Sequence, residues 1–580
     1  MTRSRQRLEQ ALRELAPTIG RDPARLAGEA EGYLAELDSR RSGTGVGLFA
    51  ALSRFICRRG YARDIVCDDG EFARVAELAR RGPVVYLITH KTYLDIFALY
   101  HALHERGIDT PYVFGGINMD FLGLGWLSRR AGGIFIRRGI RDNPVYRAAL
   151  KTAIGDLLSA GASFMWAIEG TRSRTGKLVM PKLGLLKYVV EASRELDGDP
   201  VRYLPVSIAY DQIPDVPEMT AQQTGSGKSP ESLSWFLRYI RGLRQPLGRI
   251  YVRLGEPVSL HDTPDAPALA SASAESVEVQ KLAFEVCYRI NRVTPPTTVS
   301  LVMMALLCEE GLGRARLRDD VIALFGHVQR HDPEAVKALP GEPDAELERV
   351  VAELAATGMV AESTGRLTVP RERHLAALYY SNMAAHHFVI AAFVELALLR
   401  AAEAGGAEPR RVFEHEIDRL RDLFKMEFFF ARRPEYRAAV RAELHALAPD
   451  WQSRLEAGGA GIAELVARKP LCVAQAVLRP YVEAYRVVAR ALLSGAADPD
   501  PGDDALVETC LGLGRRMADR RDILWADSAS RALVAGGLLL VRNRGLIGDG
   551  DGDGEVERRR REFDVRLADL YRRLEHLANL

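Results

Sequence analysis

Between residues 83 and 260 the sequence alternates short apolar runs, rich in β-branched and aromatic residues, with segments that have a helical period. The apolar runs are Val84–Ile88, Tyr112–Phe114, Ile134–Ile136, Ser163–Ile168, Tyr203–Ala209 and Arg249–Arg253, and the helical segments span about 92–106, 145–160, 183–196 and 232–243. This alternation predicts an α/β fold with a mixed, largely parallel sheet flanked by helices. Functional side chains of such a domain gather at the carboxyl ends of the strands.

The regions on either side of this alternation have helical patterns. Residues 1–80 are polar with a helical period, and strand patterns almost vanish after Thr294-Pro-Pro296. We therefore predict a helical N-terminal region at 1–80, an α/β domain at 81–295 and a large helical domain at 296–580. The segments 213–232 and 262–274 are rich in Pro, Ser, Gly and Thr, and we expect them to be loops on the α/β domain.

The segment Leu48–Arg59 has two interpretations. Five apolar residues fall at helical spacing with three basic residues around them: Leu48, Phe49, Leu52, Phe55, Ile56, Arg54, Arg58 and Arg59. The first interpretation is a helix that packs its apolar face on the core and leaves its back in solvent. The second is a basic amphipathic helix that lies on an anionic membrane surface.

A longer segment, Leu375–Val394, contains no Asp, Glu, Lys or Arg. It does contain Ser381, Asn382, His386 and His387, which would be costly in hydrocarbon. We therefore expect a buried helix of a large helical domain, with a re-entrant or surface-lying helix as the alternative. The longest fully apolar runs elsewhere are shorter than the roughly 20 residues that cross a bilayer.

Composition and charge narrow the classes of function. The chain has 79 Lys and Arg against 77 Asp and Glu, a formal net charge of +2. Proteins that neutralise many phosphates have a basic excess, so we expect no nucleic-acid partner. The six cysteines are scattered without a C-x-x-C pair, and the N-terminal segment lacks the apolar core of a signal peptide. We expect an intracellular protein with neither disulfides nor a metal site.

An acidic, glycine-rich stretch near the C-terminus has part of a calcium-loop pattern. Asp549, Asp551, Asp553 and Gly554 stand at the first positions of such a loop, but Arg560 stands at the twelfth, where calcium loops have a bidentate Glu. We therefore predict a solvated linker here.

The first candidate for chemistry is the stretch Ile88–Phe97. The pattern predicts His90 at the end of the strand 84–88 and Asp95 in the first turn of the next helix. A carboxylate in that place can orient the imidazole and stabilise its charged form, so the two can act as a general base with its orienting group. The spacing Thr92-x-x-Asp95 is equally that of an N-terminal capping box.

Cationic side chains follow two other predicted strands. Arg137 and Arg138 come directly after the run 134–136. A glycine-flanked turn after the run 163–168 contains four charged residues: Glu169, Arg172, Arg174 and Lys177. Convergent arginines suit a phosphate monoester, because the guanidinium fork donates two charge-assisted hydrogen bonds.

Four blocks, taken in order, resemble the glycerolipid acyltransferases. The blocks are His90 to Asp95, Phe135-Ile-Arg-Arg138, Glu169-Gly-Thr-Arg-Ser-Arg174 and Pro205-Val-Ser-Ile208. The second block is similar to glycerol-3-phosphate and dihydroxyacetone-phosphate acyltransferases, whereas lysophosphatidate acyltransferases typically have Asp where Arg137 stands. Similarity to the same branch continues through Pro181–Gly184 and Gly248–Val258, and more faintly through Tyr379–His386 and Val541–Gly545.

The resemblance implies direct transfer of an acyl group from acyl-CoA or acyl carrier protein to the sn-1 hydroxyl of glycerol 3-phosphate, as a step of phospholipid synthesis. It implies His90 as the base and Asp95 as its orienting group, and it needs no cofactor and no metal. The candidates for binding the acceptor are Arg137, Arg138, Glu169, Gly170, Arg172 and Arg174, with Lys91 and Lys177 as weaker ones. An acyl tail needs an apolar site, so we expect a peripheral protein on the cytoplasmic face of a membrane.

Two departures from the family pattern leave the acceptor open. Lys91-Thr92-Tyr93 replaces the commoner Arg-Ser-His of the bacterial enzymes, and Thr171 stands where those enzymes usually have Gly. The alternatives are a dihydroxyacetone-phosphate or lysophospholipid acyltransferase, or a non-catalytic lipid-binding scaffold.

Overall fold

The computed structural model describes residues 3–579 apart from several gaps. The gaps are 62–64, 118–123, 138–142, 195, 197–199, 224–232, 244–246, 261–273, 310, 338, 340, 342, 405–407, 470, 496–502 and 548–553. The chain forms two compact units. The first consists of Met1–Arg172, Pro181–Pro214 and Ser229–Thr294, and the second of Ser173–Met180, Asp215–Lys228 and Pro295–Leu580.

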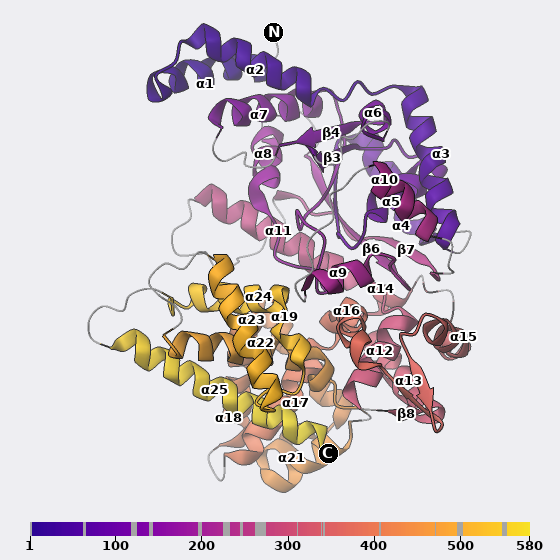
Figure 1. The fold of residues 1–580 in the computed structure, drawn as a ribbon, viewed down its shortest axis with the longest axis vertical. Coiled ribbons are helices and arrows are strands. Elements are labelled where there is room, and N and C mark those ends of the chain that lie inside the picture. The colour runs from indigo at the N-terminus through magenta and orange to yellow at the C-terminus, as the bar shows by residue number, and fades with distance from the viewer. Residues whose placement is uncertain are drawn as a thin grey trace. The chain divides into compact units, whose positions relative to one another are not determined.

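The first unit is built on a seven-stranded sheet (Figure 1). Its strands are β1 (Val66–Cys67), β2 (Val84–Ile88), β3 (Tyr112–Gly116), β4 (Gly133–Ile136), β5 (Phe164–Ala167), β6 (Arg202–Tyr210) and β7 (Ile250–Leu254). The strand order is β1-β7-β6-β2-β5-β3-β4, and every pair is parallel except β6 with β7. The predicted mixed, largely parallel sheet is confirmed, and β2 lies in its middle.

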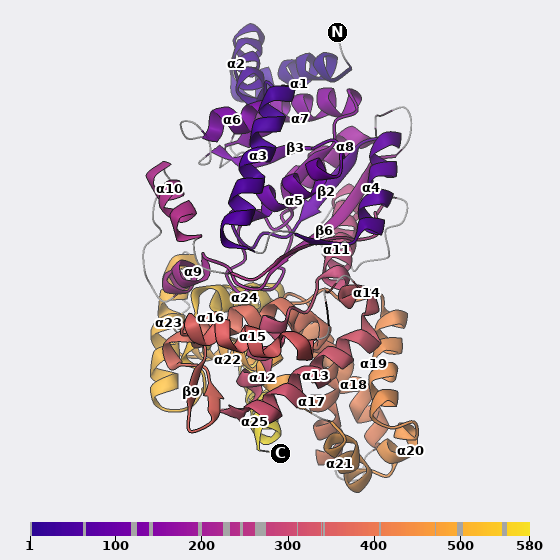
Figure 2. The same cartoon turned by 90° about the vertical axis from the view of Figure 1, so that its right-hand side faces the viewer.

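Helices cover both faces of this sheet. The helices of this unit are α1 (Arg3–Ile19), α2 (Pro23–Leu37), α3 (Gly43–Gly60), α4 (Asp69–Arg81), α5 (Leu94–Glu105), α6 (Leu124–Arg130), α7 (Pro144–Ser159), α8 (Leu183–Ser193), α10 (Leu233–Gly242) and α11 (Ala274–Val293). Figures 1 and 2 show α3, α4 and α5 on one side of the sheet and α7, α8 and α11 on the other. On β7, the buried Arg253 binds Glu71 of α4, with 2.6 Å between Nη2 and Oε1. This pair fixes α4 against the sheet.

The N-terminal helices pack directly on the α/β part. α1 and α2 bury leucines such as Leu8 and Leu26 against Val145 and Ala149 of α7. Phe49 of α3 stacks on Phe97 of α5, with 5.3 Å between ring centroids. Residues 1–80, which we predicted as a separate region, therefore fold together with the sheet in one unit. The helical period showed that these helices have an apolar face, but it did not show which partner buries that face.

The second unit is mainly helical. Its helices are α9 (Val216–Gln223), α12 (Thr298–Cys308), α13 (Arg314–His331), α14 (Pro333–Val336), α15 (Pro343–Ala356), α16 (His374–Ala384), α17 (Val389–Glu403), α18 (Pro409–Phe424), α19 (Arg433–Leu447), α20 (Trp451–Glu456), α21 (Gly459–Ala467), α22 (Ala474–Leu493), α23 (Asp503–Asp519), α24 (Arg531–Asn543) and α25 (Glu555–Ala578). The helix α22 is buried along nearly its whole length, and α12, α17, α23, α24 and α25 pack around it. α9 lies in the segment 213–232, which we had expected to be a loop.

A small antiparallel sheet also belongs to this unit. Its strands are β8 (Leu312–Gly313), β9 (Ala361–Ser363) and β10 (Arg366–Thr368), in the order β8-β10-β9. The expected loop 262–274 and the calcium-like stretch 549–554 lie almost wholly outside the described residues.

The uncharged segment Leu375–Val394 forms two buried helices where one was predicted. α16 and α17 are separated by the 3-10 turn Ala385–His387. No helix among the described residues has both the length and the apolar composition to cross a membrane by itself. The helices Arg371–His387 and Val389–Glu403 meet that composition only as a pair, and they are bent by 83° at their junction.

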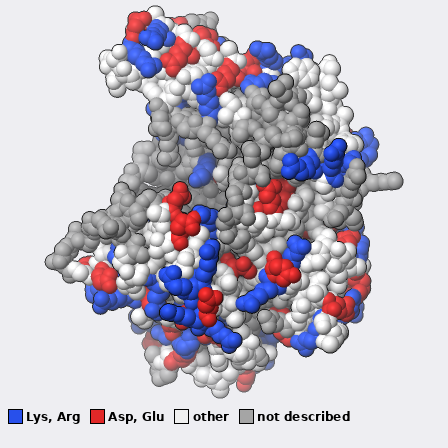
Figure 3. Space-filling view, viewed as in Figure 1, with Lys and Arg blue, Asp and Glu red and all other residues white. Residues whose placement is uncertain are grey.

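The basic run at the start of α25 lies on the surface of the second unit. Figure 3 shows Lys and Arg side chains with carboxylates among them where α25 lies. Arg558 binds Glu555 and Glu562, and Arg561 binds Glu557. The pattern is that of a solvated helix face with its own counter-charges.

Candidate functional site

The predicted His–Asp pair forms at the end of the middle strand. β2 ends at Ile88, and α5 begins at Leu94, so Asp95 lies in the first turn of that helix. His90 Nδ1 is 3.0 Å from Asp95 Oδ2. The His90 side chain is 24% exposed and that of Asp95 only 1%, so the imidazole lies between a buried carboxylate and solvent.

Three further groups donate hydrogen bonds to the Asp95 carboxylate. Oδ2 accepts the backbone N–H groups of Lys91 at 2.7 Å and Thr92 at 3.0 Å. Oδ1 accepts the hydroxyl of Tyr210 at 2.7 Å. Asp95 Oδ2 accepts hydrogen bonds from its other partners, so His90 donates its Nδ1–H to the same oxygen. The other ring nitrogen, Nε2, then has the lone pair that a general base needs.

Tyr210, at the end of β6, was not among the predicted site residues. Burial, followed by the negative charge of Asp95, raises the pKa of Tyr210 well above its usual value of 10.0. It therefore stays protonated and can act only as a donor to Asp95. Its position two residues after the Pro205–Ile208 block was the one available signal, but its contact with Asp95 depends on the pairing of β6 with β2.

Glu169 and Gly170 follow β5, the other neighbour of β2. Glu169 is fully buried, and its Oε1 accepts the backbone N–H of His90 at 2.7 Å. This oxygen holds the backbone of His90, and the role that we expect for Glu169, to orient cations or an acceptor hydroxyl, stays a prediction. Gly170 has φ +66°, and a Cβ there would lie 2.8 Å from Lys182 Cγ. The turn after β5 therefore requires glycine.

Arg172 lies against the turn that contains the His–Asp pair. Its guanidinium carbon is 3.9 Å from the centre of the Tyr93 ring, a close cation–π contact. Tyr93 in turn contacts the Tyr239 ring edge-on, and the Tyr239 hydroxyl lies 2.9 Å from Thr92 Oγ1. These contacts hold a cation next to the residues that follow His90.

Arg137 is paired with a carboxylate from the N-terminal region. Its Nε and Nη2 atoms lie 2.8 and 2.5 Å from the two oxygens of Glu36 on α2. This hydrogen bonding raises the pKa of Arg137 above its usual value. The Arg137 side chain is 47% exposed, and exposed ion pairs contribute only about 0–1 kcal/mol. An incoming phosphate can therefore compete with Glu36 for this guanidinium.

The remaining candidates have different environments. Arg138 lies outside the described residues. The side chain of Lys91 is buried, and its backbone N–H binds Asp95. Arg174 and Lys177 belong to the segment Ser173–Met180 of the second unit, where Arg174 is half-buried.

Lys177 has a partner inside the second unit. Its Nζ lies 2.6 Å from a carboxylate oxygen of Glu427, and both side chains are buried. In the same segment, a Cβ at Gly176 would overlap the carbonyl oxygen of Tyr379, and the amide of Asn382 donates to the Thr175 carbonyl at 2.9 Å. The charge of Lys177 is thus compensated by the helical unit, which makes it the weakest of the predicted phosphate-binding candidates.

Two family models and curated relatives match this chain. A model of acyltransferases matches residues 71–217, which include His90 and Asp95. A model described as the glycerol-3-phosphate acyltransferase C-terminal region matches residues 219–550, more than half of the chain. The chain is also 32% identical over 583 aligned residues to "Putative acyltransferase plsB1" of Mycobacterium bovis and of Mycobacterium tuberculosis, covering 99% of this chain and 92% of theirs.

This chain belongs to the glycerol-3-phosphate acyltransferase family.

The resemblance found in the four sequence blocks is thereby confirmed, and the protein is a glycerolipid-type acyltransferase. The family region includes the helical half, where the similarity of Tyr379–His386 and Val541–Gly545 was faint. Among solved structures, the chain is similar to the 1-acyl-sn-glycerophosphate acyltransferase PlsC of Thermotoga maritima, with 19% identity and a TM-score of 0.25, covering 49% of this chain and 92% of that one.

The arrangement gives this acyltransferase the groups that direct acyl transfer requires. His90 Nε2 can accept a proton, Asp95 fixes the tautomer, and Tyr210 with two backbone N–H groups fixes Asp95. Among the described residues nearby, Arg172 offers a positive charge held by Tyr93.

Proposed function

We propose that this acyltransferase moves a fatty acyl group from acyl-CoA or acyl carrier protein to the sn-1 hydroxyl of glycerol 3-phosphate. The product is lysophosphatidate, a precursor of phospholipids. The observation that carries the proposal is the His90–Asp95 pair, whose imidazole is oriented by a buried, multiply hydrogen-bonded carboxylate. Two findings support glycerol 3-phosphate as the acceptor. One is the match to the family model of the C-terminal region, and the other is Arg137, which stands where lysophosphatidate acyltransferases typically have Asp.

In the proposed mechanism His90 works as a general base. Its Nε2 removes the hydroxyl proton of the acceptor as that oxygen attacks the thioester carbonyl carbon. The tetrahedral intermediate collapses with cleavage of the carbon–sulfur bond. The imidazolium returns its proton to the departing thiolate, so the enzyme ends as it began. The route needs no covalent enzyme intermediate and no cofactor besides the thioester.

We propose that the phosphate of the acceptor binds to cationic side chains around the turn between β2 and α5. Arg172 is the first candidate, because Tyr93 holds its guanidinium beside the His–Asp turn. Arg137 can exchange Glu36 for a phosphate, which suits the same bidentate geometry. Arg138, Arg174 and Lys91 remain candidates, and Glu169 and Gly170 shape the backbone on which His90 and Arg172 are mounted.

We also propose that the protein attaches peripherally to the cytoplasmic face of a membrane through the outer face of α3. Phe49 and Ile56 of this helix are buried, but Leu48 and Phe55 are 52% and 53% exposed. A groove of about 610 Å³ beside them is lined by Arg54, Arg58 and Arg59 among others. Exposed apolar side chains with arginines around them suit an anionic lipid surface.

The reaction is tested with the purified full-length chain in lipid or detergent. Long-chain acyl-CoA and acyl carrier protein thioesters are each offered with glycerol 3-phosphate, dihydroxyacetone phosphate or 1-acylglycerol 3-phosphate, and the products are identified by mass spectrometry. We expect acylation of glycerol 3-phosphate. His90→Ala should lower kcat by about 10²–10⁴-fold, because it removes the general base.

The control variant is His445→Ala, which removes an exposed histidine of α19. It should keep the wild-type rate. Transfer only to dihydroxyacetone phosphate or to the one-chain acceptor would replace the proposed substrate, whereas transfer to none with either donor would favour the scaffold alternative. A His90→Ala variant as fast as wild type would refute the role of the base.

A further inference from the structure

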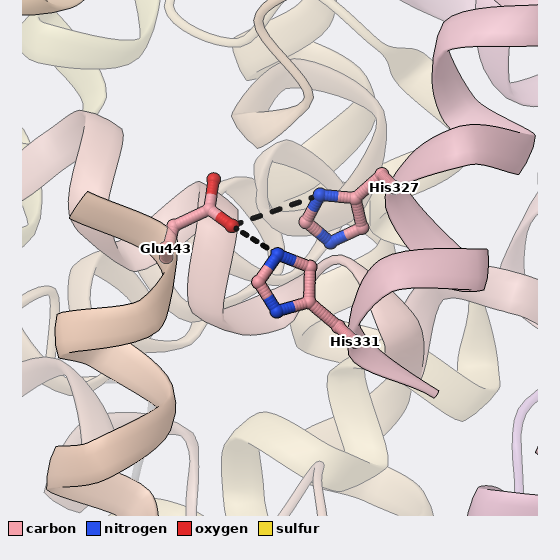
Figure 4. Close-up of side chains that lie close together, drawn as sticks. All are labelled: His327, His331 and Glu443. Carbon is pink, nitrogen blue, oxygen red and sulfur yellow. Dashed lines mark ion pairs between the residues drawn. The ribbon is translucent and has the colours of Figure 1, made fainter. Parts of the chain in front are cut away.

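Two histidines and a glutamate converge inside the second unit. His327 and His331 are one turn apart on α13, so their side chains share a face of that helix. Glu443 on α19 points between them (Figure 4). The side-chain atoms that could hold an ion all lie within 4.8 Å of one another. None of these residues takes part in the acyl transfer that we propose.

The two distances from Glu443 to the histidines are closer to the separation of two ligands on one ion than to the length of a hydrogen bond. Glu443 Oε2 is 3.6 Å from His327 Nδ1 and 3.3 Å from His331 Nε2. Hydrogen bonds between N–H and O are usually about 2.9–3.0 Å long. Two ligand atoms at about 2.0–2.1 Å from a tetrahedral Zn²⁺ lie roughly 3.3–3.4 Å apart. Both nitrogens approach the same oxygen at about that separation.

The tautomer of His327 also favours a metal ion between this histidine and Glu443. Its Nε2 lies 3.2 Å from the backbone carbonyl oxygen of His387. A carbonyl oxygen only accepts, so Nε2 bears the hydrogen, and in the neutral ring Nδ1 presents a lone pair to Glu443. A lone pair facing a carboxylate oxygen is repulsive unless a cation lies between them. A histidine that ligates a metal commonly donates its other N–H to a backbone carbonyl in this way.

The charges around the cluster also favour a bound cation. Lys469 lies 2.8 Å from Glu395 and 3.3 Å from Glu443, so one ammonium serves two carboxylates. Glu395 receives two further hydrogen bonds, from the backbone N–H groups of Val473 and Ala474. Glu443 is 6% exposed. Lys469, Glu395 and Glu443 together sum to one negative charge in a mostly buried place, which a bound cation would offset.

We propose that His327, His331 and Glu443 form a binding site for a divalent transition-metal ion, with Zn²⁺ as the best fit. Two imidazoles and one carboxylate are a zinc donor set, whereas Mg²⁺ and Ca²⁺ prefer oxygen ligands throughout. The side chains of His327 and His331 are 15% and 21% exposed, so an ion can enter from solvent and keep a water molecule as its fourth ligand. This site revises the expectation, drawn from the scattered cysteines, that the chain has no metal site.

The test measures metal binding on the full-length chain without an affinity tag. The protein is stripped with a chelator and titrated with Co²⁺, whose visible absorption reports coordination by nitrogen and oxygen ligands, and then with Zn²⁺ in competition. We expect one Co²⁺ per chain, displaced by Zn²⁺, and a higher melting temperature with Zn²⁺. His331→Ala should weaken binding at least about tenfold, because it removes a ligand.

Two further variants make the result specific. Glu443→Gln should weaken binding as His331→Ala does, while His445→Ala, which removes an exposed histidine two residues further along α19, should bind as wild type. His331 is the more exposed of the two histidines, so we expect His331→Ala to fold. It still tests the site if the Glu443→Gln variant fails to fold. The proposal is overturned if the wild type binds neither ion, or if His331→Ala binds Co²⁺ as tightly as wild type. Acyl transfer is not the readout, so failure here leaves the proposed reaction untouched.

Discussion

Asp95 is the residue on which the candidate site depends most. One carboxylate receives His90, Tyr210 and two backbone N–H groups, and it is almost completely buried. Each donor restricts its rotation, so the imidazole is held in one orientation and one tautomer. The orientation of the proposed base therefore depends on groups to which the proposed reaction assigns no contact with the substrate.

Tyr210→Phe removes one of these donors and leaves the ring in place. A hydrogen bond to a charged group contributes about 1.5–3 kcal/mol, so kcat should fall roughly 10–100-fold while KM for the acceptor changes little. Steady-state kinetics with glycerol 3-phosphate measures both parameters.

Tyr203→Phe is the matched control, because Tyr203 is an equally buried tyrosine of β6 whose hydroxyl lies 3.3 Å from Ser193 Oγ. It should keep the wild-type kcat. If both variants lost the same activity, the effect would be one of packing and not of the bond to Asp95.

The His–Asp pair could be predicted from sequence because both residues lie at an element boundary that the pattern marks. A strand that ends at Ile88 and a helix that begins near Leu94 bring positions 90 and 95 together by local geometry alone. Tyr210 and Glu169 could not be placed in the same way. Their contacts with this turn depend on which strands flank β2, and one sequence does not contain that information.

At the scale of elements, long apolar runs were predicted well and short or exposed elements were missed. The strands β2 to β7 were predicted within about two residues because each contains buried apolar residues in succession. β1 has two residues, and β9 is exposed throughout, so neither has a hydrophobic pattern. The cluster of His327 and Glu443 also has no signal in the sequence pattern, because α13 and α19 bring these residues together only in the folded unit.

The helix α3 has a buried apolar face and, on its other side, exposed apolar side chains beside arginines. Phe49 and Ile56 pack on the core, while Leu48 and Phe55 face outward with Arg54 and Arg58. The double variant Leu48→Glu with Phe55→Glu should lower binding to vesicles that contain anionic phospholipid by at least about tenfold, since burial of each apolar side chain contributes about 1.5–3 kcal/mol. Cosedimentation with vesicles measures this binding, and added salt should weaken that of the wild type.

Leu524→Glu is the control for α3, because Leu524 is a leucine of the second unit that is 62% exposed. It should bind vesicles as the wild type does. Wild-type binding by the double variant would show that α3 is not the attachment surface.

At the scale of the whole molecule, all six cysteine thiols are protected by the fold. Burial raises the pKa of each thiol above its usual value of 9.0, to about 12 for Cys57 and Cys510. At pH 8 only on the order of one such thiol in 10⁴ is ionised, against about one in ten for a free cysteine. Native protein should therefore react with iodoacetamide far more slowly than protein unfolded in guanidinium, and rapid alkylation of the native thiols would contradict these pKa values.

The same shifts in thiol pKa predict how the free energy of unfolding changes with pH. Because the folded-state pKa of each thiol is raised, the unfolded chain releases these protons at lower pH than the folded chain does. The stabilisation is complete below about pH 9 and is lost as pH rises toward 12. The urea concentration at the midpoint of unfolding, measured under reducing conditions, should fall from pH 8 to pH 10.

The division of the chain into two interleaved units limits how such a protein can change by recombination. The eight residues Ser173–Met180 follow Arg172 directly, yet they contact Tyr379, Asn382 and Glu427 of the helical unit. A gene exchange that replaced everything after residue 295 would leave this octapeptide facing foreign side chains. The acyltransferase half and the helical half can therefore be inherited from different ancestors only if the octapeptide travels with the helices.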